Sequence, residues 1–227
     1  MIVDMATIRK DVIVTDSVYH IFTRSIAGFE IFRLENCCER FVDTLQYYNQ
    51  ASPDLKFSQF LELSADSKRR LAESYQSNPL VQIISFCLMP THIHLVLKQV
   101  QNRGISTFMN NTLNSYTRYF NISHQRKGPL WESEFKNVLV DSDEQLLHLT
   151  RYVHLNPVSA GLVSSPRDWG YSSFRQYISD PFAKKICDWK GIIDIDPVVY
   201  ANFVIRRATY QRSLSLIKSL LIDNYTG

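Results

Sequence analysis

The sequence has no long run of apolar residues and few cysteines. No stretch among its 227 residues approaches the roughly 20 apolar residues that cross a lipid bilayer, and its first residues lack the hydrophobic core of a signal peptide. The four cysteines show no metal-ligand spacing and two of them are adjacent, which disfavours a disulfide framework and a zinc cluster. We therefore expect a cytoplasmic protein with reduced thiols and no membrane partner.

The net charge of +3 is too small to indicate a partner by itself, but the charge is unevenly distributed. The segment from Lys98 to Lys136 holds six basic and two acidic residues, a net charge of +4, so the rest of the chain is slightly negative. A positive segment suits a phosphate-bearing partner. A solvated helix face with lysines in adjacent loops would give the same pattern, and charge alone does not separate the two explanations.

Apolar residues recur at strand and helix periods along most of the chain. The patterns predict strands at 18–24, 80–88 and 92–98, helices at 37–50, 105–123 and 143–155, and an extended stretch within 130–140. A two-residue break at Pro90 and Thr91 favours an antiparallel hairpin. This order indicates an α+β fold, an antiparallel sheet with helices on one face, in which a split βαβ arrangement would be ferredoxin-like.

We expect one main domain with two additions. Residues 1–178 form the main domain in this division, residues 53–78 are a helical insertion within it, and residues 179–227 are a helical C-terminal extension. The insertion carries a basic triplet at 68–70, which is more often a solvated helix face than a nucleic-acid contact. One polar helix face within 105–123 carries Asn110, Asn111, Asn114, Arg118 and Asn121.

Two histidines lie one residue apart in the strand after the hairpin. Side chains alternate between the faces of a strand, so His92 and His94 share one face. The apolar side chains between and after them share the other face and are expected to point into the core. The histidine face offers two nitrogen ligands for a divalent metal site that stays open to water and substrate. Histidines satisfied within the core or at a sheet edge are the alternative.

A second group of residues lies on the helix predicted at 143–155. Tyr152 and Asn156 are four residues apart and would share one helix face. A tyrosine hydroxyl, with an ordinary pKa of about 10, becomes a useful nucleophile when a metal polarises the group under attack, and the amide oxygen of Asn156 could ligate that metal. The alternative is an ordinary amphipathic-helix tyrosine followed by a helix end at about Leu155, because Pro157 disfavours continuation.

The order and spacing of these motifs resemble the single-tyrosine HUH transposases, and most of all the REP-associated tyrosine transposases. The resemblance covers roughly two-thirds of the chain. It rests on the segments YHIFTR (19–24), MPTHIHLV (89–96), YTRYFN (116–121), GPLW (128–131), RYVHLNPVSAGLV (151–163) and WGYSSF (169–174).

The resemblance implies a ferredoxin-like HUH nuclease fold. In it, His92 and His94 would be metal ligands, with Mg²⁺ or Mn²⁺ as the metal. Tyr152 would be the nucleophile and Asn156 the third group on the metal side. The family cleaves single-stranded DNA, often beside a hairpin, leaves a 5′-phosphotyrosine and later reseals the bond to another strand. Some members are dimers that exchange tyrosine helices and others are monomers, so a homodimer is one expected assembly.

The partner that the resemblance implies is single-stranded or hairpin DNA. The candidate contacts are Arg24, Lys98, Arg103, Arg118, Arg126, Lys127, Lys136, Arg151 and Trp131. One departure from the family pattern is Glu132 with Glu134, whose carboxylates would repel phosphate unless they face away. Two other functions stay open: a domesticated hairpin-DNA-binding protein without transposition activity, and a metal-dependent hydrolase of small phosphate esters.

Overall fold

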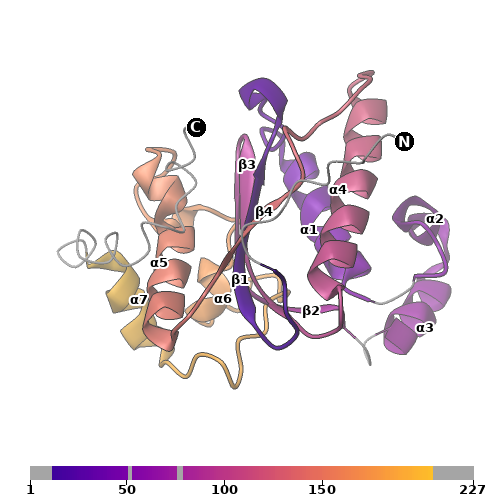
Figure 1. Cartoon of the computed structure of the whole chain (residues 1–227). Helices are drawn as coiled ribbons and strands as arrows, with labels where there is room; N and C mark the ends of the chain where they lie inside the picture. The colour runs from indigo at the N-terminus through magenta and orange to yellow at the C-terminus, as the bar shows by residue number, and fades with distance from the viewer. Residues whose placement is uncertain (1–11, 51–52, 76–78, 207–227) are drawn as a thin grey trace, which may run out of the picture.

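The computed structural model describes residues 12–50, 53–75 and 79–206 (Figure 1). The strands are β1 (Val18–Arg24), β2 (Val81–Met89), β3 (His92–Gln99) and β4 (Lys136–Leu139). The helices are α1 (Glu35–Tyr48), α2 (Phe57–Glu62), α3 (Ala65–Tyr75), α4 (Gly104–Ser123), α5 (Asp143–Ser159), α6 (Phe174–Tyr177) and α7 (Pro197–Ile205), with short 3-10 turns η1 (Ile26–Gly28) and η2 (Pro166–Asp168). None of the helices in these ranges is long and apolar enough to cross a membrane.

The four strands form one antiparallel sheet in the order β2-β3-β1-β4. Helix α1, followed by α2 and α3, connects β1 to β2, and α4 connects β3 to β4. Strand β3 lies between β1 and β2 and is antiparallel to both. This is the split βαβ topology of a ferredoxin-like fold. The predicted α+β fold with a ferredoxin-like antiparallel sheet is therefore confirmed, including the hairpin between β2 and β3.

Both faces of the sheet are covered by helices. On one face, Leu97 packs with Phe41 of α1 and Phe108 of α4. On the other face, Val96 packs with Leu149 of α5, and Figure 1 shows α5 across the sheet from α1 and α4. The prediction of helices on one face holds for the two crossover helices and needs a correction for α5. The physical reason is that the central strands are apolar on both faces, and each face needs cover.

Helix α5 continues past the proline that was expected to stop it. Pro157 lies inside the helix, which ends at Ser159 rather than at Leu155. The last turn stays closed because the backbone N–H of Ala160 donates to the carbonyl of Asn156 at 2.9 Å. The proline removes one N–H donor but leaves these later bonds intact. Asn156 therefore keeps helical geometry and stays one turn beyond Tyr152.

The two additions pack on opposite sides of the molecule (Figure 1). Phe57 and Phe60 of the insertion pack against two tyrosines of α1, so α2 and α3 lie beside the α1 and α4 layer. Tyr200 of α7 belongs to an apolar cluster that includes residues of α5 and α6. The extension predicted as helical over residues 179–227 is irregular at 179–196 and then forms α7. The rest of that prediction, from residue 207 on, lies outside the described residues.

Candidate active site

Three histidines gather on the sheet face that α5 covers. His92 and His94 share this face of β3, and the strand register places Arg24 and Phe22 of β1 opposite them. The imidazole centroids of His92 and His94 are 5.0 Å apart with an angle of 84° between the ring planes. His20 is two residues from Phe22 on β1 and so faces the same side. His20 was not among the residues predicted from the sequence.

His20 makes direct contact with His94. Nε2 of His20 lies 3.0 Å from Nδ1 of His94, and the two rings are stacked with 12° between their planes. Both side chains are fully buried. The other ring nitrogen of His94, Nε2, is also buried, and it has no hydrogen-bond partner among the described residues. One nitrogen of His94 is thus held in place while the other can accept a ligand.

The environment keeps His94 neutral. Burial lowers its pKa well below the ordinary 6.5, and the neighbouring His92, His20 and Arg24 lower it further. A neutral imidazole is the form that ligates a metal ion. The site therefore presents a ligating nitrogen at physiological pH without first having to lose a proton.

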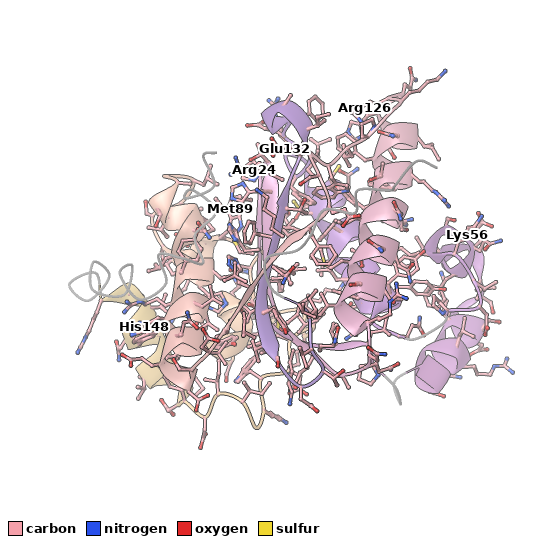
Figure 2. The ribbon with its side chains drawn as sticks, in the orientation of Figure 1. Arg24, Lys56, Met89, Arg126, Glu132 and His148 are labelled. Atoms are coloured by element: carbon pink, nitrogen blue, oxygen red, sulfur yellow. The ribbon has the colours of Figure 1, made fainter. Side chains whose placement is uncertain are left out.

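Tyr152 lies over these histidines from α5. Its ring centroid is 5.6 Å from that of His94 and 6.3 Å from that of His20, and both pairs are close to edge-to-face. Its side chain is 6% exposed and packs in the same cluster as Met89, which lies between the sheet and α5 (Figure 2). The contact between tyrosine and histidine is made within one chain.

Asn156 follows Tyr152 by one turn of α5. Its amide nitrogen is buried and has no hydrogen-bond partner in the described part of the chain. Rotation of the amide by half a turn exchanges nitrogen and oxygen, so either atom can occupy this position. A buried amide end without a partner suits a group that receives a ligand. No hydrogen bond joins it to His92 or His94 within the described residues.

The residues present fit an open metal site rather than a closed one. Within residues 12–50, 53–75 and 79–206, no three His, Cys, Asp or Glu side chains are grouped so that they could hold a metal ion. Two imidazoles with an amide oxygen would leave coordination positions for water and a phosphate oxygen. The buried, unpartnered Nε2 of His94 is the observation that such a site would explain.

Part of this site lies in a segment that is similar to known proteins. Residues 58–156 match the family described as "Transposase IS200 like". Residues 58–156 of this chain are thus similar to the IS200-like transposases. The match spans most of α2, then α3, β2, β3, α4, β4 and α5 as far as Asn156, and it leaves β1 with His20 outside. It agrees with the resemblance to the single-tyrosine transposases. The IS200-like transposases are DNA-processing enzymes.

Two known proteins are similar to this chain to different degrees. A protein of Haemophilus influenzae described as a REP-associated tyrosine transposase is 28% identical over 124 residues, which cover 50% of this chain and 69% of the relative. A solved structure of a REP-associated tyrosine transposase bound to a REP hairpin is 14% identical, with a TM-score of 0.47, and covers 82% of this chain and 97% of that chain.

At the edge of the histidine face, Arg24 pairs with Glu132 (Figure 2). The Nε atom of Arg24 lies 4.0 Å from Oε2 of Glu132, and both side chains are about half exposed. The backbone N–H of Glu132 also donates to the carbonyl of Arg24 at 3.0 Å. Glu132 therefore does not face away from the candidate phosphate contacts, and its carboxylate occupies one of them.

Three of the predicted DNA contacts have other partners in the structure. Arg151 is 1% exposed, and its guanidinium lies 4.5 Å from the ring centroid of Phe203 in α7, so its prediction as a DNA contact disagrees with its burial. Trp131 is half-buried and donates to the carbonyl of Leu113 at 3.3 Å. Arg126 donates to carbonyl oxygens of its own turn. These roles are structural.

The remaining predicted contacts are distributed over both faces. Lys98 lies at the far end of β3 and pairs with Asp16 at 3.4 Å. Arg118 is exposed on α4, on the other side of the sheet from Tyr152. Three more basic residues are exposed at element ends and turns: Arg103, Lys127 and Lys136. Of all the predicted contacts, Arg24 is the one that the strand register places beside the histidines.

Proposed function

We propose that this chain is a single-strand DNA endonuclease and strand transferase that acts through Tyr152. The observation that carries the proposal is the packing of the Tyr152 ring against His94, with ring centroids 5.6 Å apart. A tyrosine beside the ligating nitrogen of His94 suits phosphoryl transfer, since the hydroxyl attacks a phosphate that a metal ion held there would activate. The similarity of residues 58–156 to the IS200-like transposases supports DNA as the substrate, and the H. influenzae relative is described as a tyrosine transposase.

The cofactor in this proposal is a divalent metal ion, Mg²⁺ or Mn²⁺. His92, His94 and Asn156 would hold it. Bound there, the ion would polarise the scissile phosphate and offset its negative charge. The protein supplies a neutral His94, held through its Nδ1 atom by His20, and a sheet surface that keeps the ligating groups in fixed positions.

The chemistry assigned to the chain exchanges one phosphodiester for another. The Tyr152 hydroxyl attacks the phosphorus, a bond forms from its oxygen to phosphorus, and the bond from phosphorus to the 3′ oxygen breaks. The tyrosine loses its proton to solvent and the departing 3′ oxygen gains one. The products are a 5′-phosphotyrosine and a 3′-hydroxyl. Attack by another 3′-hydroxyl reverses the exchange and transfers the strand without ATP.

The helix that carries Tyr152 is fixed by a buried polar contact. Nδ1 of His154 lies 2.6 Å from the Tyr200 hydroxyl of α7, and its Nε2 lies 2.7 Å from the Ser173 hydroxyl. These contacts tie α5 to the segments that follow it. Together with the contact between Tyr152 and His94, they support cleavage by the tyrosine of the same subunit, so the proposal does not require exchange of α5 within a homodimer.

Covalent capture of DNA tests the proposal. The protein is incubated with a hairpin oligonucleotide that carries a single-stranded flank and a 3′-end label, with Mn²⁺ or with a chelator. We expect a labelled protein–DNA adduct with the metal and none with the chelator. A domesticated binding protein would bind the hairpin without forming an adduct. A small-ester hydrolase would turn over a chromogenic phosphate ester, also without an adduct.

A further inference from the structure

A groove runs between α4 and the segment that leads into α2. Its volume is about 930 Å³. One wall is the outer surface of α4, and the other includes Lys56 and Gln59 of the insertion, where Lys56 stands on the α2 side in Figure 2. The groove lies on the α1 and α4 side of the sheet, whereas Tyr152 lies on the α5 side (Figure 1). It is therefore separate from the candidate active site.

The α4 wall presents amide and guanidinium groups that have no partner within the part of the chain that the structure describes. Asn111, Asn114 and Arg118 line the groove along one side of the helix, and among the described residues no hydrogen bond or ion pair engages their side chains. Asn121, on the same polar helix face, differs because it donates to the carbonyl of Gly128 and serves the fold. The asparagines that line the groove are thus not used for local structure.

The rest of the lining adds positive charge and flat or apolar surface. Arg40 lies with its guanidinium 4.9 Å from the ring centroid of Tyr119, and its Nε is buried with no hydrogen-bond partner in the described residues. Arg40, Lys56 and Arg118 are opposed by the single carboxylate of Asp54 among the lining residues. Ile122, at the end of the same wall, is 80% exposed.

We propose that this groove binds single-stranded DNA, a role that deepens the proposed function because it takes DNA as the substrate. Guanidinium and ammonium groups bind phosphates, carboxamides such as that of Asn114 pair with base edges, and exposed aromatic or apolar side chains receive unpaired bases. An acidic peptide would satisfy the cations but would not need the row of amides. A duplex also presents base edges to amides in its major groove, and a bare hairpin in the test below separates a duplex from a single strand.

The position of the groove defines which part of the DNA it holds. A segment in the groove lies across the sheet from Tyr152 and is not the segment that is cut. The groove therefore holds a single-stranded flank at a distance from the cleavage point. A hairpin with a long flank should reach both places, whereas a bare hairpin has no single strand to place in the groove.

Binding of two DNA probes by two matched variants tests this inference. The groove variant is Asn114→Ala with Arg118→Gln, and the control is Asn110→Ala with Arg70→Gln, which changes the same residue types at exposed positions outside the groove. We expect the wild type and the control to bind the flanked hairpin about tenfold to a hundredfold more tightly than the bare hairpin. The groove variant should lose that advantage. The slope of its log binding constant against log salt concentration should also become smaller in magnitude by about 0.7, which corresponds to one lost phosphate contact.

The groove inference and the nuclease proposal at Tyr152 can be tested independently. Adduct formation at saturating DNA should be equal in the groove variant and the wild type, and their thermal midpoints should agree because both substituted side chains are exposed. A groove variant that retains the full advantage of the flank overturns the groove inference, as does a wild type without any preference for the flank. Loss of that advantage in a protein that forms no adduct supports the groove and overturns the proposed nuclease.

Discussion

Nε2 of His20 and Nδ1 of His94 lie 3.0 Å apart in two fully buried rings. Between two neutral imidazoles, only one of these nitrogens carries the shared proton. If Nε2 of His20 carried the proton, His94 would be protonated on its own buried Nε2, an N–H donor without an acceptor, at a cost of about 1–3 kcal/mol. If Nδ1 of His94 carries the proton, Nε2 of His94 keeps a lone pair directed away from His20. His20 therefore acts as a positioning residue that selects the ligating tautomer of His94.

Replacing His20 with Phe should weaken metal binding while leaving the chain folded. Loss of the partner that orients a ligating histidine typically lowers metal affinity by about 10–100-fold. Titration calorimetry with Mn²⁺ measures this change, and His124→Phe, at an exposed histidine of α4's C-terminal end, is the control.

Nitrogen chemical shifts of the His94 ring in the metal-free protein give a reading that does not depend on activity. We expect the proton on Nδ1 in the wild type and a changed tautomer balance in His20→Phe. A proton on Nε2 of wild-type His94, or unchanged Mn²⁺ affinity in the variant, would show that His20 only fills space.

Glu132→Gln should strengthen DNA binding. The exposed pair with Arg24 contributes only about 0–1 kcal/mol to stability, so the variant should fold normally. Without the carboxylate, the Arg24 guanidinium is available to phosphate and one repulsive charge is removed. We expect a several-fold lower Kd for single-stranded DNA, with the largest gain at low salt. Glu134→Gln makes the same change in net charge two residues away, and equal gains in both variants would rule out a specific role for Glu132.

The protein should lose stability as the pH falls below about 6.5. Burial lowers the pKa of His154 from 6.5 to about 3, so between these values the unfolded state binds more protons than the folded state. The free energy of unfolding then falls by about 1.4 kcal/mol per pH unit for this group, and its contribution is complete above pH 6.5. Urea unfolding at several pH values measures the slope. His154→Gln should reduce this slope by the contribution of one proton. An unchanged slope would contradict the lowered pKa of His154.

Local patterns in the sequence predict most of the fold. The strand at 18–24 and the hairpin at Pro90 and Thr91 agree with the structure, because alternation and turn chemistry depend on neighbours in the chain. The face that α5 covers could not be predicted in the same way. It depends on which strand faces remain apolar after α1 and α4 have packed, and that is a property of the assembled sheet.

The residues of the candidate site also differ in whether local spacing could predict them. Alternation places His92 with His94, and helical spacing places Tyr152 with Asn156, so those pairs could be predicted. His20 could not, because it reaches His94 only through the pairing of β1 with β3. Arg151 was misassigned for the opposite reason. A charged residue on a helix is expected to face solvent, but α7 covers that part of α5.

The most direct test of the account is a denaturing gel of the protein after incubation with Mn²⁺ and a 3′-end-labelled flanked hairpin. The label stays with the protein because the tyrosine would hold the 5′ phosphate of the 3′ fragment. We predict a labelled adduct for the wild type and for the control Tyr171→Phe, and none for Tyr152→Phe despite unchanged DNA binding. A labelled adduct with Tyr152→Phe, or its absence from the wild type, would contradict the assignment of Tyr152 as the nucleophile.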